Sequence, residues 1–248
     1  MMKRSKITRK IFQLLLLVCI TLSVISQNEN IEITKAEIIK NAWKAMFGKL
    51  KPDEIKSIYV ESYFHGSKVP NIMTVKRPNL FRNEISGGGV IVFDGKQAAW
   101  AQQTNDKNGN PRFPEMIDTA SWRHFEIDIA LIFPAFFEYP CELRGLKSFE
   151  ETNAYELYVE LPLGGNVSYF VDDKTFLVTR RLVSWSGDPK EKLWENFITN
   201  YLDYNGILFP DGYSFEGREG IDKGLFKNVK FNVNPKDELF EIPKELNK

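Results

Sequence analysis

The alternation of apolar and polar residues predicts that most of this chain forms antiparallel β-structure. From Ile55 onward, short segments repeat the two-residue period of a strand and are bounded by tight turns such as Asp94-Gly95 and Asn205-Gly206. Because short turns pair each strand with its neighbour in sequence, we expect a meander. The expected strands lie within residues 55–64, 69–76, 80–85, 97–101, 142–148, 154–161, 167–171, 176–185, 193–204, 207–215 and 225–233.

A first helix is predicted ahead of these strands, over residues 31–48. Thr34 and Glu37 have the spacing of a capping box, apolar residues recur at helical spacing, and Gly48 ends the segment. The apolar residues form one stripe. The helix must therefore lie against another element, and the sheet is the available partner.

A second helix is predicted over residues 119–133, inside a strongly apolar and aromatic stretch. Asp118-Thr119 provides its start and Pro134 limits its end. Since this helix is apolar over much of its circumference, it has to be covered on more than one side.

Together these elements indicate an α+β fold built on a single curved antiparallel sheet of about 10–11 strands, because so many strands curl instead of staying flat. The helices are expected to cover its concave face. No linker or internal repeat divides the 248-residue chain, so we expect one domain over residues 27–248. Two layers normally close around a packed core. A ligand site therefore requires that they stand apart.

The first 26 residues have the pattern of a cleavable secretory signal peptide. Five Lys and Arg residues precede an apolar run over residues 11–25, and polar residues follow Ser26. An uncleaved membrane anchor is the alternative, although the run is short against the roughly 20 residues that a span needs. Lipidation of Cys19 is a further alternative, but Val18 precedes it where a small residue is required.

Removal of this segment leaves an acidic chain. The segment carries five of the 33 Lys and Arg residues and none of the 33 Asp and Glu residues, so 28 positive and 33 negative side chains remain, a net charge of −5. Nucleic acid binding requires a concentrated basic face, so no such partner is expected. Cys141 is the one cysteine left, and a disulfide-stapled module is therefore excluded.

The sequence offers no arrangement of reactive groups typical of an enzyme. His65 and His124 are far apart and lack the spacing of a metal site or a catalytic triad. The acid pair Asp172-Asp173 is typical of a turn, and the Gly-rich segment 86–89 lacks the Lys and the following helix of a phosphate loop. We therefore expect no catalytic residue, no metal and no cofactor.

Four segments resemble LolA-type periplasmic lipoprotein carriers. The most specific is VKRPNLF at residues 75–81, which is followed at the family's distance by DGK and Trp100. YFVDDKTFLVTRR at 169–181 is similar to the family's late hairpin, and FKNVKFNVNPKDELFEIP at 226–243 is similar to its closing strand and C-terminal segment. With the first helix, the resemblance covers about residues 33–243.

The resemblance implies a half-barrel whose apolar cavity takes acyl chains. It implies that Arg77 holds a helical lid closed and that Trp100 faces the interior. Residues 102–139 are longer and more aromatic than the family's lid region, which bears on the cargo. The residues expected to bind the ligand lie on the expected strands and the second helix and its continuation: Arg77, Phe81, Phe93, Trp100, Trp122, Phe125, Ile129, Phe133 and Phe136.

The expected function is therefore that of a monomeric periplasmic carrier. It would hold the acyl part of a lipoprotein or another lipid and pass it from a membrane donor to an outer-membrane acceptor. A lipid-sensing or interaction module on the same fold is a non-enzymatic alternative, and a hydrolase with an unclustered site is a third. A membrane-tethered acceptor of the LolB type is disfavoured, because the mature N-terminus lacks a cysteine.

Overall fold

The structure is a computed structural model that describes residues 33–64, 67–86, 88–100, 115–150, 152–185, 193–216 and 221–242. The signal peptide expected at residues 1–26 lies outside them. The elements below belong to one compact unit, Lys35–Lys248. None of the helices in the described ranges is both long enough and apolar enough to cross a membrane.

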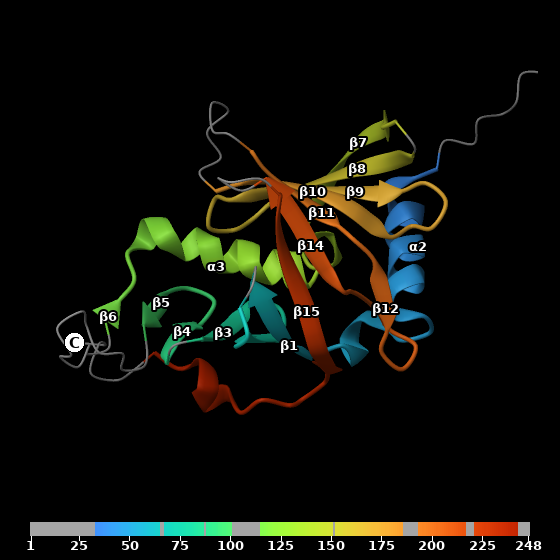
Figure 1. The fold of residues 1–248 in the computed structure, drawn as a ribbon. Coiled ribbons are helices and arrows are strands. Elements are labelled where there is room, and N and C mark those ends of the chain that lie inside the picture. The colour runs from blue at the N-terminus through green and yellow to red at the C-terminus, as the bar shows by residue number, and fades with distance from the viewer. Residues whose placement is uncertain are drawn as a thin grey trace, which may run out of the picture. The chain divides into compact units, whose positions relative to one another are not determined.

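Thirteen strands form one antiparallel sheet in the order β6-β5-β4-β3-β2-β1-β15-β14-β11-β10-β9-β8-β7 (Figure 1). The N-terminal strands are β1 Ser57–Phe64, β2 Asn71–Lys76, β3 Leu80–Ile85, β4 Gly89–Phe93, β5 Ala98–Trp100 and β6 Glu115–Met116. The C-terminal strands are β7 Cys141–Ser148, β8 Asn153–Glu160, β9 Asn166–Asp172, β10 Val178–Ser184, β11 Trp194–Ile198, β14 Gly212–Glu216 and β15 Ile221–Phe231.

Two meanders meet at the middle of this sheet. The N-terminal meander runs outward from β1 to the edge strand β6, and the C-terminal one begins at the opposite edge with β7 and ends with β15 beside β1. The join is antiparallel, with Ile58 opposite Phe231. The chain must therefore pass from one edge of the sheet to the other between β6 and β7.

Helix α3, Thr119–Ile132, makes this passage. Its 14 residues span about 21 Å at 1.5 Å per residue, whereas 13 strands about 4.8 Å apart cover an arc of about 57 Å. A helix of this length spans the space between the two halves because the sheet curls. Figure 1 shows α3 running between the half that contains β1–β5 and the half that contains β7–β11.

The ends of α3 follow the sequence prediction. Asp118 is the N-cap, and its Oδ1 accepts a hydrogen bond from the Ser121 amide at 3.1 Å. At the other end, the Phe133 amide donates to the Ile129 carbonyl at 2.8 Å, and Pro134 follows. The prediction of a helix over 119–133 is therefore confirmed.

Helix α2, Lys35–Phe47, confirms the first predicted helix over most of its length. Gly48 follows it with φ of 62°, a conformation that glycine adopts without strain. Ile38, Ala42 and Met46 recur at helical spacing and are buried, which is the one-sided stripe that the sequence indicated.

The curved α+β sheet is confirmed, but the strand count of 10–11 is too low, because the sheet also contains β4 and β6, which lie outside the expected ranges. Residues 193–204 and 207–215 each divide at a corner, so that β12 Tyr201–Asp203 and β13 Leu208–Pro210 pair with one another apart from the main sheet. The corners are tied by a hydrogen bond of 2.8 Å from Thr199 Oγ1 to Asp211 Oδ1. Apolar alternation continues through these corners, and the pattern alone could not reveal the breaks.

The core lies between the helices and the concave face of the sheet. On the side of β3 and β4, the rings of Phe81 and Phe93 pack against Phe125 of α3, with centroids 6.4 and 6.3 Å apart. Trp43 and Phe47 of α2 contact the same core near the end of α3. The interior is solid over this part of the sheet.

One close approach in β4 gives a stability prediction. A Cβ on Gly89 would lie 2.2 Å from the Trp100 ring, so Gly89→Ala should force the ring or the strand to move. We expect the free energy of unfolding to fall by about 1–3 kcal/mol, measured by urea denaturation. In a Trp100→Ala background, Gly89→Ala should lower the free energy of unfolding much less. An equal cost in both backgrounds would contradict the assigned clash.

Candidate functional site

The polar groups at the C-terminal end of α3 are satisfied by side chains from the sheet. The last four carbonyls of a helix have no partner within it. Tyr169 of β9 is fully buried, and its hydroxyl donates to the Ala130 carbonyl at 2.9 Å and accepts from the Ala135 amide at 2.9 Å. One phenol therefore bridges the last turn of α3 and the segment that follows.

Arg181 of β10 is the second anchor of this helix end. Its Nη1 donates to the Leu131 carbonyl, and its Nε and Nη2 donate to Asn196 Oδ1 at 3.0 and 2.7 Å. Arg181 is 3 % exposed, and burial lowers the pKa of its guanidinium. Within the described residues it has no carboxylate partner, so the negative end of the α3 dipole is its compensation.

Arg77 anchors the other side of the same helix end. It follows β2 and forms an ion pair with Glu138, and its Nη1 donates to the Pro52 carbonyl at 2.5 Å. Its guanidinium lies 4.2 Å from the centroid of the Phe133 ring, a favourable cation–π geometry. Arg77 thus joins the turn after β2 to the end of α3.

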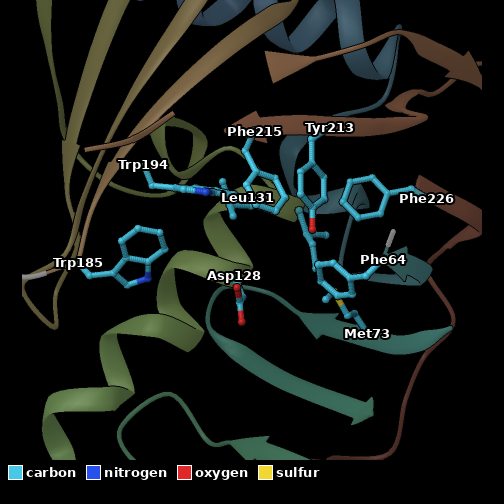
Figure 2. Close-up of a pocket in the computed structure, with 10 residues that line it drawn as sticks. Phe64, Met73, Asp128, Leu131, Trp185, Trp194, Tyr213, Phe215 and Phe226 are labelled. Atoms are coloured by element: carbon cyan, nitrogen blue, oxygen red, sulfur yellow. The ribbon is translucent and has the colours of Figure 1, made fainter. Parts of the chain in front are cut away.

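On the side of α3 that faces β11, β14 and β15, helix and sheet stand apart around a cavity of about 200 Å³ (Figure 2). Its wall comes from α3 and from β1, β2, β11, β14 and β15, together with the residue after β10. Ten residues line it, and all except one are apolar or aromatic: Phe64, Met73, Asp128, Leu131, Ile132, Trp185, Trp194, Tyr213, Phe215 and Phe226.

Asp128 is the charged member of this wall. Figure 2 shows its carboxylate directed from α3 into the space between Trp185 and Phe64. Burial raises the pKa of Asp128 from 3.8 to about 7. Burial raises the pKa of the Tyr213 hydroxyl, and the negative charge of the nearby Asp128 raises it further.

None of the nine residues expected to bind a ligand lines this cavity. Six of them are buried in packed surroundings: Phe81, Phe93, Phe125, Ile129, Phe133 and Phe136. Trp122 donates from Nε1 to the Ile117 carbonyl at 2.7 Å. Trp100 is half-buried, and its Nε1 lacks a partner within the described part of the chain.

The sequence analysis missed the aromatic residues of the cavity wall. Tyr213 and Phe215 are two residues apart on β14, which places them on one face of the strand. Trp185 and Trp194 flank the connection between β10 and β11, and their rings are 5.6 Å apart. Alternating aromatic residues in 207–215 were therefore a signal, but the concave face could be identified only from the folded sheet.

Groups that could perform catalysis are dispersed in the described residues. No three His, Cys, Asp or Glu side chains there are placed to hold a metal ion. Asp172 has the turn role that the sequence indicated: burial acts to raise its pKa, but hydrogen bonds from Thr175 and Lys174 hold it below its ordinary value. His124 packs its ring 5.8 Å from Trp185, and His65 lies outside the described residues.

The raised pKa of Asp128 predicts a pH-dependent stability. Between about pH 4 and 7 the folded chain holds a proton that the unfolded chain has lost, so the free energy of unfolding falls as pH rises. The loss is at most about 4 kcal/mol, because one pKa unit is worth about 1.4 kcal/mol. Asp128→Asn should remove this loss, so that its stability relative to the unsubstituted protein increases from pH 5 to pH 8.

Urea denaturation of both proteins at each pH measures this difference, and the other titrating groups cancel in it. Asp53→Asn, a change at an exposed carboxylate outside the cavity, is the matched control. If the free energies of unfolding of Asp128→Asn and the unsubstituted protein differ by the same amount at both pH values, Asp128 is not desolvated.

Comparison with known proteins shows which solved structures have a similar architecture. No protein-family profile and no curated protein sequence matches the chain. Among solved structures, it is similar to a LolA superfamily protein from Nitrosomonas europaea, with 14 % identity, a TM-score of 0.51, and coverage of 84 % of this chain and 98 % of that one.

Two further solved structures are similar at lower scores. A DUF1329 family protein from Desulfovibrio piger has 15 % identity and a TM-score of 0.46 over 83 % of this chain and 96 % of its own. A lipoprotein-sorting protein domain from Vibrio parahaemolyticus has 13 % identity and a TM-score of 0.44 over 83 % and 95 %. The first similarity and the curved, unclosed sheet crossed by α3 give the chain a LolA-like fold.

Proposed function

We propose that this protein is a periplasmic carrier that holds the acyl part of a lipoprotein or another lipid between α3 and the sheet, and delivers it to the outer membrane. The observation that carries the proposal is the cavity beside α3, in which nine of the ten lining residues are apolar or aromatic. The LolA-like fold and the expected signal peptide are consistent with it.

The energetics of an acyl chain explain why such a protein needs an apolar interior. Moving a fourteen-carbon chain out of water is worth about 0.8 kcal/mol per methylene, or about 11 kcal/mol in total. A protein that takes lipid across an aqueous compartment has to supply a comparable environment. The rings of Trp194, Phe215 and Phe226 provide it along the cavity wall.

The cavity is small for a whole acyl chain. Its volume of about 200 Å³ lies below the roughly 300–1,000 Å³ of pockets that enclose drug-sized ligands. Loading therefore requires α3 to move away from β14 and β15, and the structure corresponds to a closed form. When the lipid leaves, α3 regains its contacts with β14 and β15. These contacts favour release, so bound lipid is not held irreversibly.

The anchors at the end of α3 set the balance between closed and open forms. Arg181 and Tyr169 hold this end by hydrogen bonds, and Arg77 holds it through its contact with the Phe133 ring and its ion pair with Glu138 in the segment that follows. A hydrogen bond to a charged group contributes about 1.5–3 kcal/mol and a neutral one about 0.5–1.5 kcal/mol. This is less than the gross energy of acyl transfer. A lipid that fills the cavity can therefore compensate for the loss of one or two anchors.

Filling the cavity should weaken lipid binding. Leu131→Trp places an indole in the cavity, and a ligand must displace it at a cost of about 1–3 kcal/mol. Solvent extraction and mass spectrometry of gently purified protein should give stoichiometric lipid from the unsubstituted chain and roughly tenfold less from the variant. The control is Leu146→Trp on β7, where Leu146 is 52 % exposed and outside the cavity.

An extract without lipid from the unsubstituted protein, together with no binding of added acyl probes, would overturn the carrier proposal. Lipid bound in a stable complex with a membrane regulator, without transfer to an acceptor membrane, would instead favour a lipid sensor on the same fold.

Weakening the Arg77 anchor should accelerate exchange of cargo. Arg77→Leu removes the ion pair with Glu138 and the cation–π contact with Phe133. We expect a fluorescent acyl probe to dissociate roughly tenfold faster, since the closed form loses at least about 1.5 kcal/mol. The control is Arg82→Leu on β3, which removes a surface ion pair with Glu84. Unchanged exchange in Arg77→Leu, measured by stopped-flow fluorescence, would show that this anchor does not control opening.

A further inference from the structure

The carboxylate in the aromatic cavity has no protein partner to neutralise it. Asp128 projects from α3 into a space otherwise lined by apolar and aromatic side chains. Within the described residues it makes no ion pair and no hydrogen bond. An unpaired carboxylate in such surroundings opposes folding when it is ionised. A Leu or Met at this position would complete the apolar wall without that cost.

The basic residues closest to Asp128 in sequence, and the buried Arg181, make contacts with other groups. Arg123, on the same helix, donates from Nη1 to the Trp185 carbonyl at 3.0 Å. The Arg181 guanidinium is occupied by Asn196 and the Leu131 carbonyl. His124 packs against the Trp185 ring. The cavity thus keeps one negative group facing its open space.

The rings next to Asp128 form a surface suited to a cation. The Trp194 ring lies 5.6 Å from Trp185 and 5.2 Å from Phe215, and Tyr213 stacks on Phe215 at 6.0 Å. Aromatic faces attract ammonium groups, Trp most strongly, and aromatic cages for quaternary ammonium ligands use this attraction. A carboxylate beside such rings adds a full negative charge to their partial one.

The cavity is also of the right size for a head group. A cavity of about 150 Å³ in another protein accommodates benzene, so about 200 Å³ accepts an alkylammonium group with its adjacent methylenes without opening of α3. An entire acyl chain does not fit in this closed form. The charged end of an amphiphile therefore fits the closed form, whereas a whole acyl chain requires α3 to move.

We propose that the cavity between α3, β11 and β14 binds the cationic alkylammonium end of an amphiphile, with Asp128 as its counter-ion and Trp185, Trp194 and Phe215 as its aromatic cage. The inference rests on the proposed lipid-binding function and specifies the chemical class of its ligand. An anionic head group is disfavoured at this site, because it would face the Asp128 carboxylate. The ammonium of a phospholipid head group and that of a free amine share this chemistry.

Calorimetric titration with single-chain amphiphiles below their micelle concentrations tests this inference. The probes share a dodecyl chain and differ in the head: dodecyltrimethylammonium, dodecylphosphocholine, dodecyl maltoside and dodecyl sulfate. At pH 8 we expect one of the two ammonium probes to bind at least about tenfold more tightly than the maltoside. Tighter binding of phosphocholine identifies a phospholipid head group, and tighter binding of trimethylammonium identifies a free amine.

Asp128→Asn should remove this preference. We expect the affinity for the ammonium probe to fall about tenfold and the affinity for the maltoside to change less than about twofold. Trp185→Leu should weaken the ammonium probe to a smaller extent, and Asp53→Asn should change neither. The Asn variant removes a destabilising charge at pH 8, so its folding is not at risk.

The outcomes separate this inference from the carrier proposal. Equal binding of all four probes, unaffected by Asp128→Asn, would overturn the cation site and leave the carrier proposal standing. Binding of the sulfate probe in preference to the ammonium probes would also overturn it. Binding of no probe at all would overturn the cation site and, together with an extract without lipid, the carrier proposal as well.

Discussion

The satisfaction of the carbonyls at the end of α3 is the constraint on which the rest of this structure depends. A helix that ends inside a protein cannot leave its last carbonyls to water. Phe133 caps one of them, Tyr169 a second and Arg181 a third. Tyr169 belongs to β9 and Arg181 to β10, so the helix end is fixed to the C-terminal half of the sheet. Arg77, which follows β2, joins it to the N-terminal half through the Phe133 ring.

Because α3 is held at this end, the two sides of the helix differ. Toward β3 and β4 its side chains interlock with Phe81 and Phe93, and the interior is solid. Toward β11, β14 and β15 it leaves an apolar cavity with one carboxylate. The solid side provides the stability of the fold, and the open side is where a ligand can exchange contacts with the helix. In the carrier proposed above, this division would allow one helix to serve both as core and as lid.

Local interactions explain why much of the fold could be read from the sequence. Asp118 begins α3 with a side-chain cap and Pro134 ends it by a steric block, and both effects are encoded within a few residues. Most strand positions followed from two-residue alternation and turn residues in the same way. The corner between Thr199 and Asp211 did not, because it depends on a hydrogen bond between two segments that alternation cannot join. The residues that line the cavity are a stronger case, since which face of a strand is concave depends on how the whole sheet curls.

The sequence by itself determined the class of the fold, the position of its two helices and the need to cover an apolar α3, because periodicity and caps act over a few residues. Only the tertiary structure decided which aromatic residues pack and which remain around a space. Phe125 and Phe215 are equally apolar in sequence, yet one fills the core and the other lines the cavity. That difference arises from how far α3 stands from each half of the sheet, a distance set by contacts between residues remote in the chain.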